Sequence, residues 1–352
     1  MDTLIAPAPL DLRTRTWIAG ELLDGADAGR LEERLVVLGV ARETAAREIA
    51  ALLSSDYLRA ATIHMRRARK AEQLLELYAA MWRRSNDARG ITEATSLGAA
   101  EFAENYYARN RPVIVRGGAA HWPAVGTWTP RWFAERFPDA QVEYMAGTDR
   151  YAAESARTRT TMREFAERVE SVRAANDFYI VATNKSFRNG ALAPLAADLR
   201  PIAFAPQIDL GDPRAVRLWF GPRGTITPLH HDVMNVLFAQ VYGVKEFVLA
   251  PSFCWPMAYN DAGLHSEFDP IVLDVKRFPR AAAIPWLRAK VGPGDLLFIP
   301  LGWWHWVYAA TTSISIGLGD FEVAGAYDEW NDADVAPAGG PFPQQTRKAD
   351  RR

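Results

Sequence analysis

The sequence predicts a mainly β fold with added helices, preceded by an α-helical N-terminal region. Three observations support this prediction. Apolar residues recur at helical spacing between Arg30 and Asn86, short β-rich runs broken by Gly and Pro follow residue 90, and strands dominate beyond Asp177. Many short strands in succession favour a closed barrel or two packed sheets. A domain boundary is therefore expected near residue 90.

The composition of the 352 residues is that of an ordinary globular protein. Hydrophobic residues make up 49% and charged residues 24%, which excludes intrinsic disorder and a small stapled scaffold. The 41 basic and 42 acidic residues give a net charge of −1, so nucleic acid is not an expected partner. Cys254 is the single cysteine, as expected in a reducing compartment. No apolar run reaches about 18 residues, so we expect a cytoplasmic protein without a membrane segment.

The N-terminal region, residues 1–90, is expected to hold two or three helices. Ala, Leu, Glu and Arg dominate its helical part, and proline is absent there. The last helix is predicted to begin near Ser55-Asp56, which can cap it, and to run to about Arg84. Its apolar stripe has two interpretations, packing in the core or a module for dimerisation or substrate docking.

The second region, residues 91–335, is expected to contain interspersed helices and then mostly strands. Helical stretches are predicted at 97–108, 129–137 and 161–175. The predicted strands are short β-branched and aromatic runs, at 111–118, 178–184, 215–222, 235–243, 245–252, 295–302 and 313–321. Residues 336–352 are polar and rich in Pro and Gly, which predicts a flexible tail.

The residues best suited to chemistry lie in the run TITPLHHD, residues 225–232. His230 and Asp232 are two positions apart, so in an extended chain their side chains point to the same face. His305 follows in GDLLFIPLGWWHWV, where a Pro-Leu-Gly turn would deliver it from another strand. Two imidazoles and one carboxylate can occupy one face of an octahedron and leave three positions open, as in non-haem Fe(II) oxygenases. These three residues are therefore the predicted catalytic metal ligands.

The other histidines are expected to have other roles. His231 alternates with its neighbours along the strand, so it is expected to face away from the metal and to pack or contact substrate. His64 lies in the N-terminal helical region, His121 precedes Trp-Pro, and His265 lies in a loop rich in Gly and Asp. These three are expected to be structural or solvated.

Several motifs in order resemble the cupin-like Jumonji-C oxygenases. They are NRPVIVRGGAAHWPAVGTWTPRWFAERF, TPLHHDVMNVLFAQVYGVKEFVLAPS and GDLLFIPLGWWHWV, and the resemblance covers residues 93–322. Within that family the pattern is similar to the asparaginyl hydroxylase that acts on hypoxia-inducible factor. The resemblance implies a double-stranded β-helix of the jelly-roll kind that uses Fe(II) and 2-oxoglutarate as co-substrate.

The resemblance also implies roles for single residues. His230, Asp232 and His305 match the family's iron ligands, and Thr227 matches a threonine that helps to bind 2-oxoglutarate. Lys245, in the GVKEF run, matches the lysine whose ammonium pairs with the far carboxylate of 2-oxoglutarate. A buried lysine requires such an anion, because an unpaired ammonium in a barrel interior is costly.

Four further positions follow from the same comparison of motifs. Tyr179 resembles the tyrosine whose hydroxyl joins the carboxylate site, with a core aromatic as the alternative. Many relatives carry an asparagine where this chain has Val236, and the neighbouring Asn235 either substitutes for it or faces away. Gly317 stands where the family often has an asparagine near the metal, which removes one polar contact to the co-substrate.

The function implied by the resemblance is hydroxylation of a protein or peptide side chain, with dioxygen as oxidant and release of succinate and CO2. Small-molecule hydroxylation by the same chemistry is the first alternative. Lysine demethylation is a weaker one, because the chain has no basic arm. A non-catalytic cupin that binds a ligand would show a broken triad or a lost lysine, and a cupin isomerase or dioxygenase would usually require more histidines. A homodimer through the helical region is the other expected association.

Overall fold

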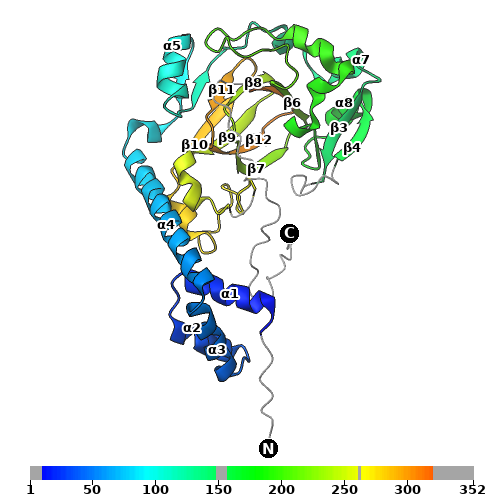
Figure 1. The fold of residues 1–352 in the computed structure, drawn as a ribbon. Helices are drawn as coiled ribbons and strands as arrows, with labels where there is room; N and C mark the ends of the chain where they lie inside the picture. Colours follow the sequence, from blue (N-terminus) through cyan, green and yellow to red (C-terminus); the bar gives the residue numbers. More distant parts are fainter. Residues whose placement is uncertain (1–9, 148–156, 261–262, 320–352) are drawn as a thin grey trace, which may run out of the picture. The chain divides into compact units, whose positions relative to one another are not determined.

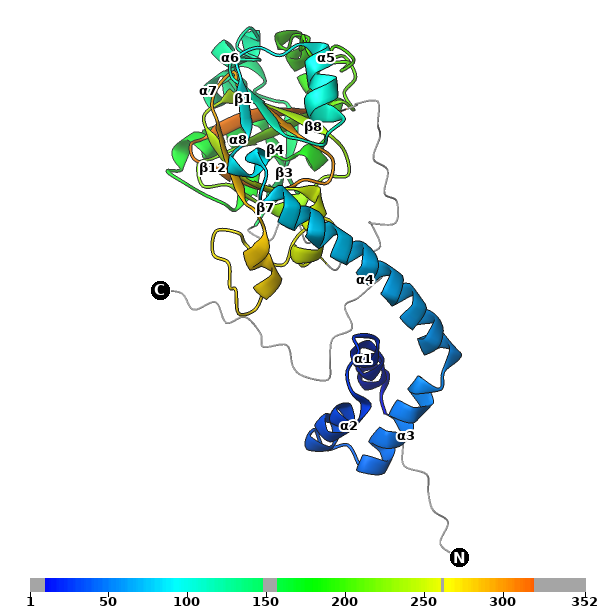
Figure 2. The same ribbon diagram turned by 90° about the vertical axis from the view of Figure 1, so that its left-hand side faces the viewer.

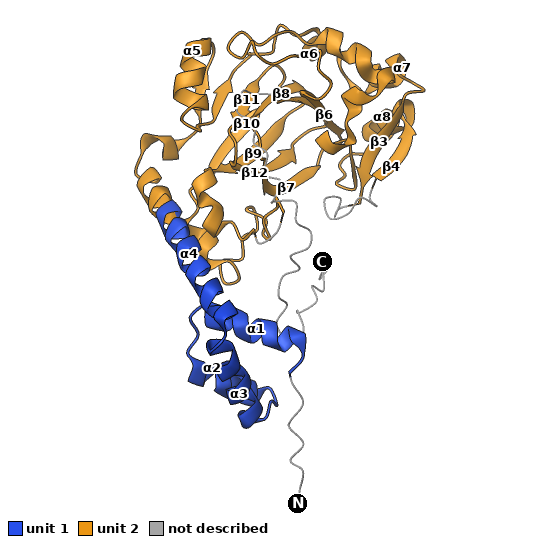
Figure 3. Ribbon diagram, in the orientation of Figure 1, with its two compact units in different colours: residues 1–75, 332–352 blue, residues 76–331 orange. Residues whose placement is uncertain are grey.

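The structure, a computed structural model, describes residues 10–147, 157–260 and 263–319 (Figure 1). In this part of the chain there are two compact units, and the division falls within one helix, between Leu75 and Glu76 (Figure 3). The last turns of the N-terminal helical region therefore belong to the second unit. The helices of these ranges include none that is long and apolar enough to cross a membrane. The predicted tail, 336–352, lies outside the described residues.

The first unit is helical. Its helices are α1 (Leu12–Leu23), α2 (Ala28–Val37), α3 (Arg42–Leu53) and most of α4 (Asp56–Trp82). The side chains of Asp11 and Asp27 cap α1 and α2 by accepting backbone N–H groups. The prediction of a long helix from Asp56 is confirmed, and it ends two residues before the expected Arg84. Helix α1 was not predicted, because it buries only Thr14 and Ile18 and its apolar face is weak.

The second unit contains two facing sheets (Figure 1). The first has the order β1 (Thr92–Ala94), β2 (Val113–Val115), β11 (Leu296–Ile299), β8 (Val236–Tyr242), β13 (Ser313–Leu318), β6 (Val216–Gly221). The second has the order β10 (Leu287–Val291), β9 (Lys245–Ala250), β12 (Trp304–Ala309), β7 (Ile226–His231). One buried cluster joins side chains of both sheets, among them Phe238 of β8 and Phe247 of β9. The chain therefore has the predicted double-stranded β-helix preceded by helices.

A smaller sheet and several helices complete this unit. The sheet has the order β4 (Arg157–Thr161), β3 (Gln141–Ala146), β5 (Phe178–Tyr179). The α-helices are α5 (Ala99–Phe102), α6 (Pro123–Thr127), α7 (Pro130–Arg136) and α8 (Met162–Ser171), the last with a capping box at Thr161. Helices α7 and α8 pack against each other, and α6 contacts β8 (Figure 2). Their apolar faces share the largest buried cluster with β6, β8 and β13.

The remaining elements are short helical turns. A π-helix (Ala103–Tyr107) continues α5, so the helix predicted over 97–108 changes its hydrogen-bond pattern midway. The 3-10 helices are η1 (Asn86–Arg89), η4 (Ala182–Asn184), η5 (Ser186–Arg188), η6 (Gly190–Asp198), η7 (Ser252–Met257) and η8 (Pro279–Ala283). The strand predicted over 178–184 was therefore too long. Only its first two residues pair with β3, and the chain then turns through η4.

Candidate metal centre and adjoining cavity

The two strands that carry the histidines lie side by side. His230 of β7 and His305 of β12 are directly opposite in antiparallel register, and their ring centroids are 4.0 Å apart. Asp232 follows the end of β7, and one of its carboxylate oxygens lies 3.7 Å from Nε2 of His305. One ligand atom from each residue falls within 4.8 Å of the others. The structure thus brings the three predicted ligands together.

Backbone carbonyl groups orient both imidazoles. Nδ1 of His230 lies 2.8 Å from the carbonyl oxygen of Pro228, and Nδ1 of His305 lies 2.9 Å from that of Trp303. When Nδ1 carries the proton and donates it to the carbonyl, Nε2 keeps its lone pair for a metal. Burial lowers the pKa of His230 to about 4, with the neighbouring His305 as a smaller cause, and burial also lowers the pKa of His305. Both rings are therefore neutral at pH 7, which is the form that binds metal.

The turn before β12 fixes the position of His305. Gly302 has φ of +77°, a left-handed conformation that favours glycine, and its N–H donates to the carbonyl of Asp232. Leu301 is bound on both sides: its N–H donates to Oδ1 of Asn235 at 2.9 Å, and its carbonyl accepts from Nδ2 of Asn110 at 2.9 Å. The side chain of Asn235 thus holds this turn and is not among the residues that line the cavity, which favours the alternative that it faces away from the co-substrate.

A cavity of about 180 Å³ adjoins the three ligands. His230, Asp232 and His305 line it, and Thr227, Tyr179 and Lys245 line it as well. Most other lining residues are apolar. Five of these apolar residues come from β8, β9, β11 and β12: Val236, Phe238, Phe247, Ile299 and Val307. The volume suits a small co-substrate and is below the size usual for drug-like ligands.

Lys245 and Tyr179 form a polar pair within this cavity. Each side chain is about 1% exposed, and Nζ of Lys245 donates a hydrogen bond of 2.8 Å to the hydroxyl oxygen of Tyr179. Burial lowers the pKa of Lys245 to about 7. Among the described residues no carboxylate forms an ion pair with Lys245, so the lysine lacks the anion that a buried ammonium requires.

The position of Gly317 is filled by a neighbouring ring. A Cβ built on Gly317 would lie 2.4 Å from Cζ3 and 2.6 Å from Cη2 of Trp219. Trp219 also lines the cavity and contacts Phe238 edge-on, with ring centroids 5.9 Å apart. An indole thus occupies the space in which the family's asparagine was expected.

The sequence did not indicate that His265 lies beside the metal-ligand set. His265 lines the cavity, stacks on His230 with ring centroids 5.4 Å apart, and pairs with it as a β-bridge. We expected a structural or solvated residue, and the partly buried ring has structural contacts with β7 that a loop residue makes only in the folded chain. His231 does face away, since its buried ring packs against Trp304 at 4.7 Å. His64 and His121 are exposed, as expected.

These residues fit a divalent transition metal bound by two nitrogens and one oxygen. Neutral imidazoles with free Nε2 atoms and one adjacent carboxylate make the facial donor set of Fe(II) oxygenases, and an apolar cavity beside it leaves room for further ligands. The fold and the site together define a cupin-type domain with a candidate metal-binding triad.

The chain belongs to the cupin-like domain family, whose profile matches residues 99–325. Three similar proteins are lysine-specific demethylase JMJ30 of Arabidopsis thaliana, the Jumonji C domain-containing protein 5 of Drosophila melanogaster, and the bifunctional peptidase and (3S)-lysyl hydroxylase JMJD7 of Homo sapiens. The first is 27% identical over 250 residues (67% of this chain, 56% of that protein). The second is 24% identical over 228 residues, which are 62% of this chain and 56% of that protein. The third is 25% identical over 251 residues, which are 62% of this chain and 79% of that protein. The chain thus spans about half the length of the first two.

Proposed function

We propose that the protein is an Fe(II)- and 2-oxoglutarate-dependent oxygenase that hydroxylates a protein or peptide side chain. One observation carries the proposal: a cavity with the His230, Asp232 and His305 donor set also contains a buried lysine that has no carboxylate partner among the described residues. A metal site alone would not require this second, cationic group. A dicarboxylate co-substrate accounts for both the metal-ligand set and the buried lysine, because one end can chelate the metal while the other neutralises Lys245.

Different residues of the site would bind the metal and the co-substrate. His230, Asp232 and His305 would hold Fe(II) and leave three adjacent positions free. Lys245 and the hydroxyl of Tyr179 would bind the far carboxylate of 2-oxoglutarate by charge-assisted hydrogen bonds. When bound, the metal and its co-substrate supply the activation of dioxygen and the oxidation of a C–H bond.

The cavity walls would protect this chemistry from water. Thr227 lies on the same strand as His230 and lines the cavity, and its hydroxyl would assist in binding the co-substrate. The apolar side chains of Phe238 and Phe247 and the ring of Trp219 cover the remaining walls. A dry cavity strengthens the pairing between Lys245 and a carboxylate.

The names of the relatives support a protein as the substrate. JMJ30 is named a lysine-specific demethylase and JMJD7 a lysyl hydroxylase, so both names describe action on amino-acid residues. The motifs also resemble those of the asparaginyl hydroxylase that acts on hypoxia-inducible factor. Because these relatives differ in the residue that they modify, the proposal concerns a protein side chain and no particular residue type.

The proposal is tested by anaerobic titration of the full chain with Fe(II) and 2-oxoglutarate. We expect the weak visible charge-transfer band of the chelate and, after oxygen is added, slow formation of succinate. The variant Lys245→Ala should weaken binding of 2-oxoglutarate more than binding of iron. Iron binding without the band would overturn the proposal and favour a cupin that uses another ligand.

A further inference from the structure

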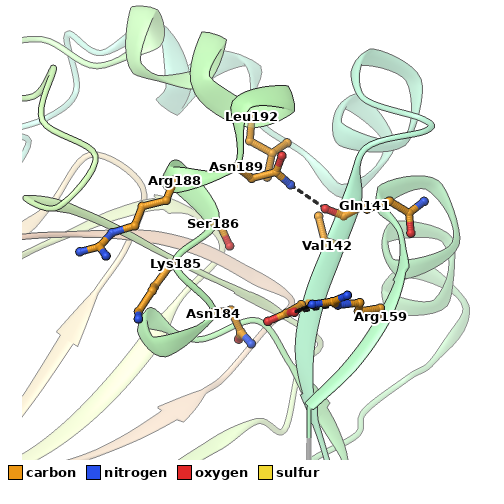
Figure 4. Close-up of a pocket in the computed structure, with 10 residues that line it drawn as sticks. Gln141, Val142, Arg159, Asn184, Lys185, Ser186, Arg188, Asn189 and Leu192 are labelled. Atoms are coloured by element: carbon orange, nitrogen blue, oxygen red, sulfur yellow. Dashed lines mark hydrogen bonds and ion pairs between the residues drawn. The ribbon is translucent and has the colours of Figure 1, made fainter.

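A second pocket lies on the smaller sheet (Figure 4). It has a volume of about 410 Å³ and lies between strands β3 and β4 and the segment from Asn184 to Leu192. The chain around this segment lies between the second pocket and the metal cavity. Ala182 and Thr183 line the metal cavity, and the next residues, Asn184 and Lys185, line the second pocket. A ligand in the second pocket is therefore one short turn of chain away from the metal site.

One edge of β3 is open along this pocket. β5 pairs with β3 only at Met145 and Ala146, and no described strand pairs with the rest of β3 on that side. The carbonyl of Gln141 points to this side, where it accepts a hydrogen bond of 2.6 Å from Nδ2 of Asn189 (Figure 4). Main-chain groups of alternate residues in an antiparallel strand point to the same side, so those of Glu143 also face the pocket. Such an edge can accept an added strand.

A buried amide donor also marks the pocket. The side-chain oxygen of Asn184 accepts the N–H of Val181 at 2.8 Å, but its Nδ2 is buried and has no hydrogen-bond partner. A buried N–H group without an acceptor loses its hydrogen bonds to water and gains none in return, so such groups are uncommon unless a ligand or water binds them. An acceptor atom of a ligand would satisfy Nδ2 of Asn184.

The charges of the pocket favour an anion. Arg159 forms an ion pair with Glu143 at 2.8 Å, so these two charges balance. Lys185 and Arg188 also line the pocket, and neither forms an ion pair with a carboxylate among the described residues. Among the residues that line the pocket, positive charges therefore exceed negative ones by two, although the nearby carboxylate of Asp212 interacts with Arg188, and the polar lining residues provide further amide and hydroxyl groups.

We propose that this pocket binds an extended acidic segment of the polypeptide substrate, which adds to the free edge of β3 as a strand. Its main chain would pair with Glu143, and a carboxylate side chain would accept a hydrogen bond from Nδ2 of Asn184 beside Lys185 and Arg188. Main-chain pairing supplies affinity, and the basic side chains select for acidic sequence. This inference rests on the proposed function, because it assigns the pocket to the substrate of the neighbouring site.

The experiment measures binding of a fluorescein-labelled octapeptide of alternating Glu and Val to the full chain by fluorescence anisotropy. The variant Lys185→Glu/Arg188→Glu should bind it at least about tenfold more weakly, because charge reversal replaces attraction by repulsion. The matched control Lys276→Glu/Arg277→Glu changes the same charges on exposed residues outside both cavities and should bind normally. The same octapeptide with N-methylated alternate amides keeps its charge but cannot pair with an edge, so it should bind weakly.

Three results of the direct binding measurements would overturn the proposal: equal loss in the two double variants, equal binding of an octapeptide of alternating Lys and Val, or undiminished binding of the N-methylated peptide. Competition supplies a fourth. Free succinate and inorganic phosphate, added as competitors, should displace the peptide only weakly, and full displacement at equal concentration would overturn peptide docking in favour of a small-anion site. Peptide binding requires neither iron nor 2-oxoglutarate. A missing charge-transfer band with intact peptide binding would therefore reject the oxygenase function alone, and the reverse result would reject only the docking pocket.

Discussion

The ammonium group of Lys245 and the hydroxyl of Tyr179 are 2.8 Å apart inside a barrel cavity that also contains the metal-ligand set. Both side chains are almost fully buried. A lysine in such surroundings is destabilised in its charged form, which is why its pKa falls to about 7. We expect Lys245 and Tyr179 to bind a carboxylate of 2-oxoglutarate together. The pH dependence of 2-oxoglutarate binding should test this role.

The affinity for 2-oxoglutarate should fall as the pH rises above about 7. Burial of the side chain lowers the pKa of Lys245 to about 7, and a carboxylate bound beside it would raise this pKa. Below pH 7 the lysine is already protonated, so affinity is constant there. Above pH 7 binding must take up a proton, and affinity should fall by up to about tenfold per pH unit. Titration of the Fe(II) protein between pH 6.5 and 8.5 measures the slope. The variant Lys245→Arg keeps its positive charge throughout this range, so its affinity should not change with pH. A wild-type affinity that is independent of pH would contradict the role of Lys245 in binding the carboxylate.

The variant Asp232→Ala should lose bound iron while the fold persists. Removal of the single carboxylate leaves two imidazoles, which hold a divalent metal much more weakly. The side chain of Asp232 is about one-third exposed, so the free energy of unfolding should change by no more than about 0.5 kcal/mol. Iron content after desalting and a thermal melt measure the two effects. The exposed Asp139→Ala is the control, and full iron retention in Asp232→Ala would remove these residues from consideration as a metal site.

The variant Asn235→Ala should lower both stability and iron affinity. It leaves the N–H of Leu301 without its acceptor, at a cost of about 1–3 kcal/mol, and it loosens the turn that leads to His305. Denaturant unfolding and an iron titration measure the two losses. Asn189→Ala removes a comparable side-chain hydrogen bond to Gln141, far from the turn in sequence, and should leave iron affinity unchanged. Equal iron affinities in both variants would show that the turn does not position the ligand.

Truncation at two points should separate the two units. Deletion of residues 1–75 keeps Trp82, which packs edge-on against Phe253 and Trp303 with ring centroids 6.0 and 6.3 Å apart. Deletion of residues 1–90 removes Trp82 and should lower the free energy of unfolding by roughly a further 1–3 kcal/mol, because Trp82 is only partly buried and its loss costs less than that of a core tryptophan. Thermal melts of the two truncated proteins and of full-length Trp82→Ala make the comparison. Equal melting temperatures would contradict this role of Trp82.

Much of this architecture could be predicted because its signals are local. The alternating runs gave most strands, and His230 and Asp232 lie on one short strand end, so their common face followed from spacing alone. The roles of Asn235 and His265 could not be predicted. Asn235 binds a turn 66 residues away in the sequence, and His265 forms a β-bridge to β7 from a loop. Both contacts depend on tertiary packing that no local sequence pattern encodes.

The pair of Gly317 and Trp219 should behave as one unit in mutagenesis. The variant Gly317→Asn introduces a Cβ 2.4 Å from the indole, so the ring must move within the cavity wall. We expect a stability loss of about 1–3 kcal/mol from overpacking and weaker binding of 2-oxoglutarate. Trp219→Ala alone should also destabilise, but combined with Gly317→Asn it frees the space that the new side chain needs. A double-mutant cycle by denaturant unfolding should then give a favourable coupling of about 0.5–3 kcal/mol, whereas additive losses would show that the two residues act independently.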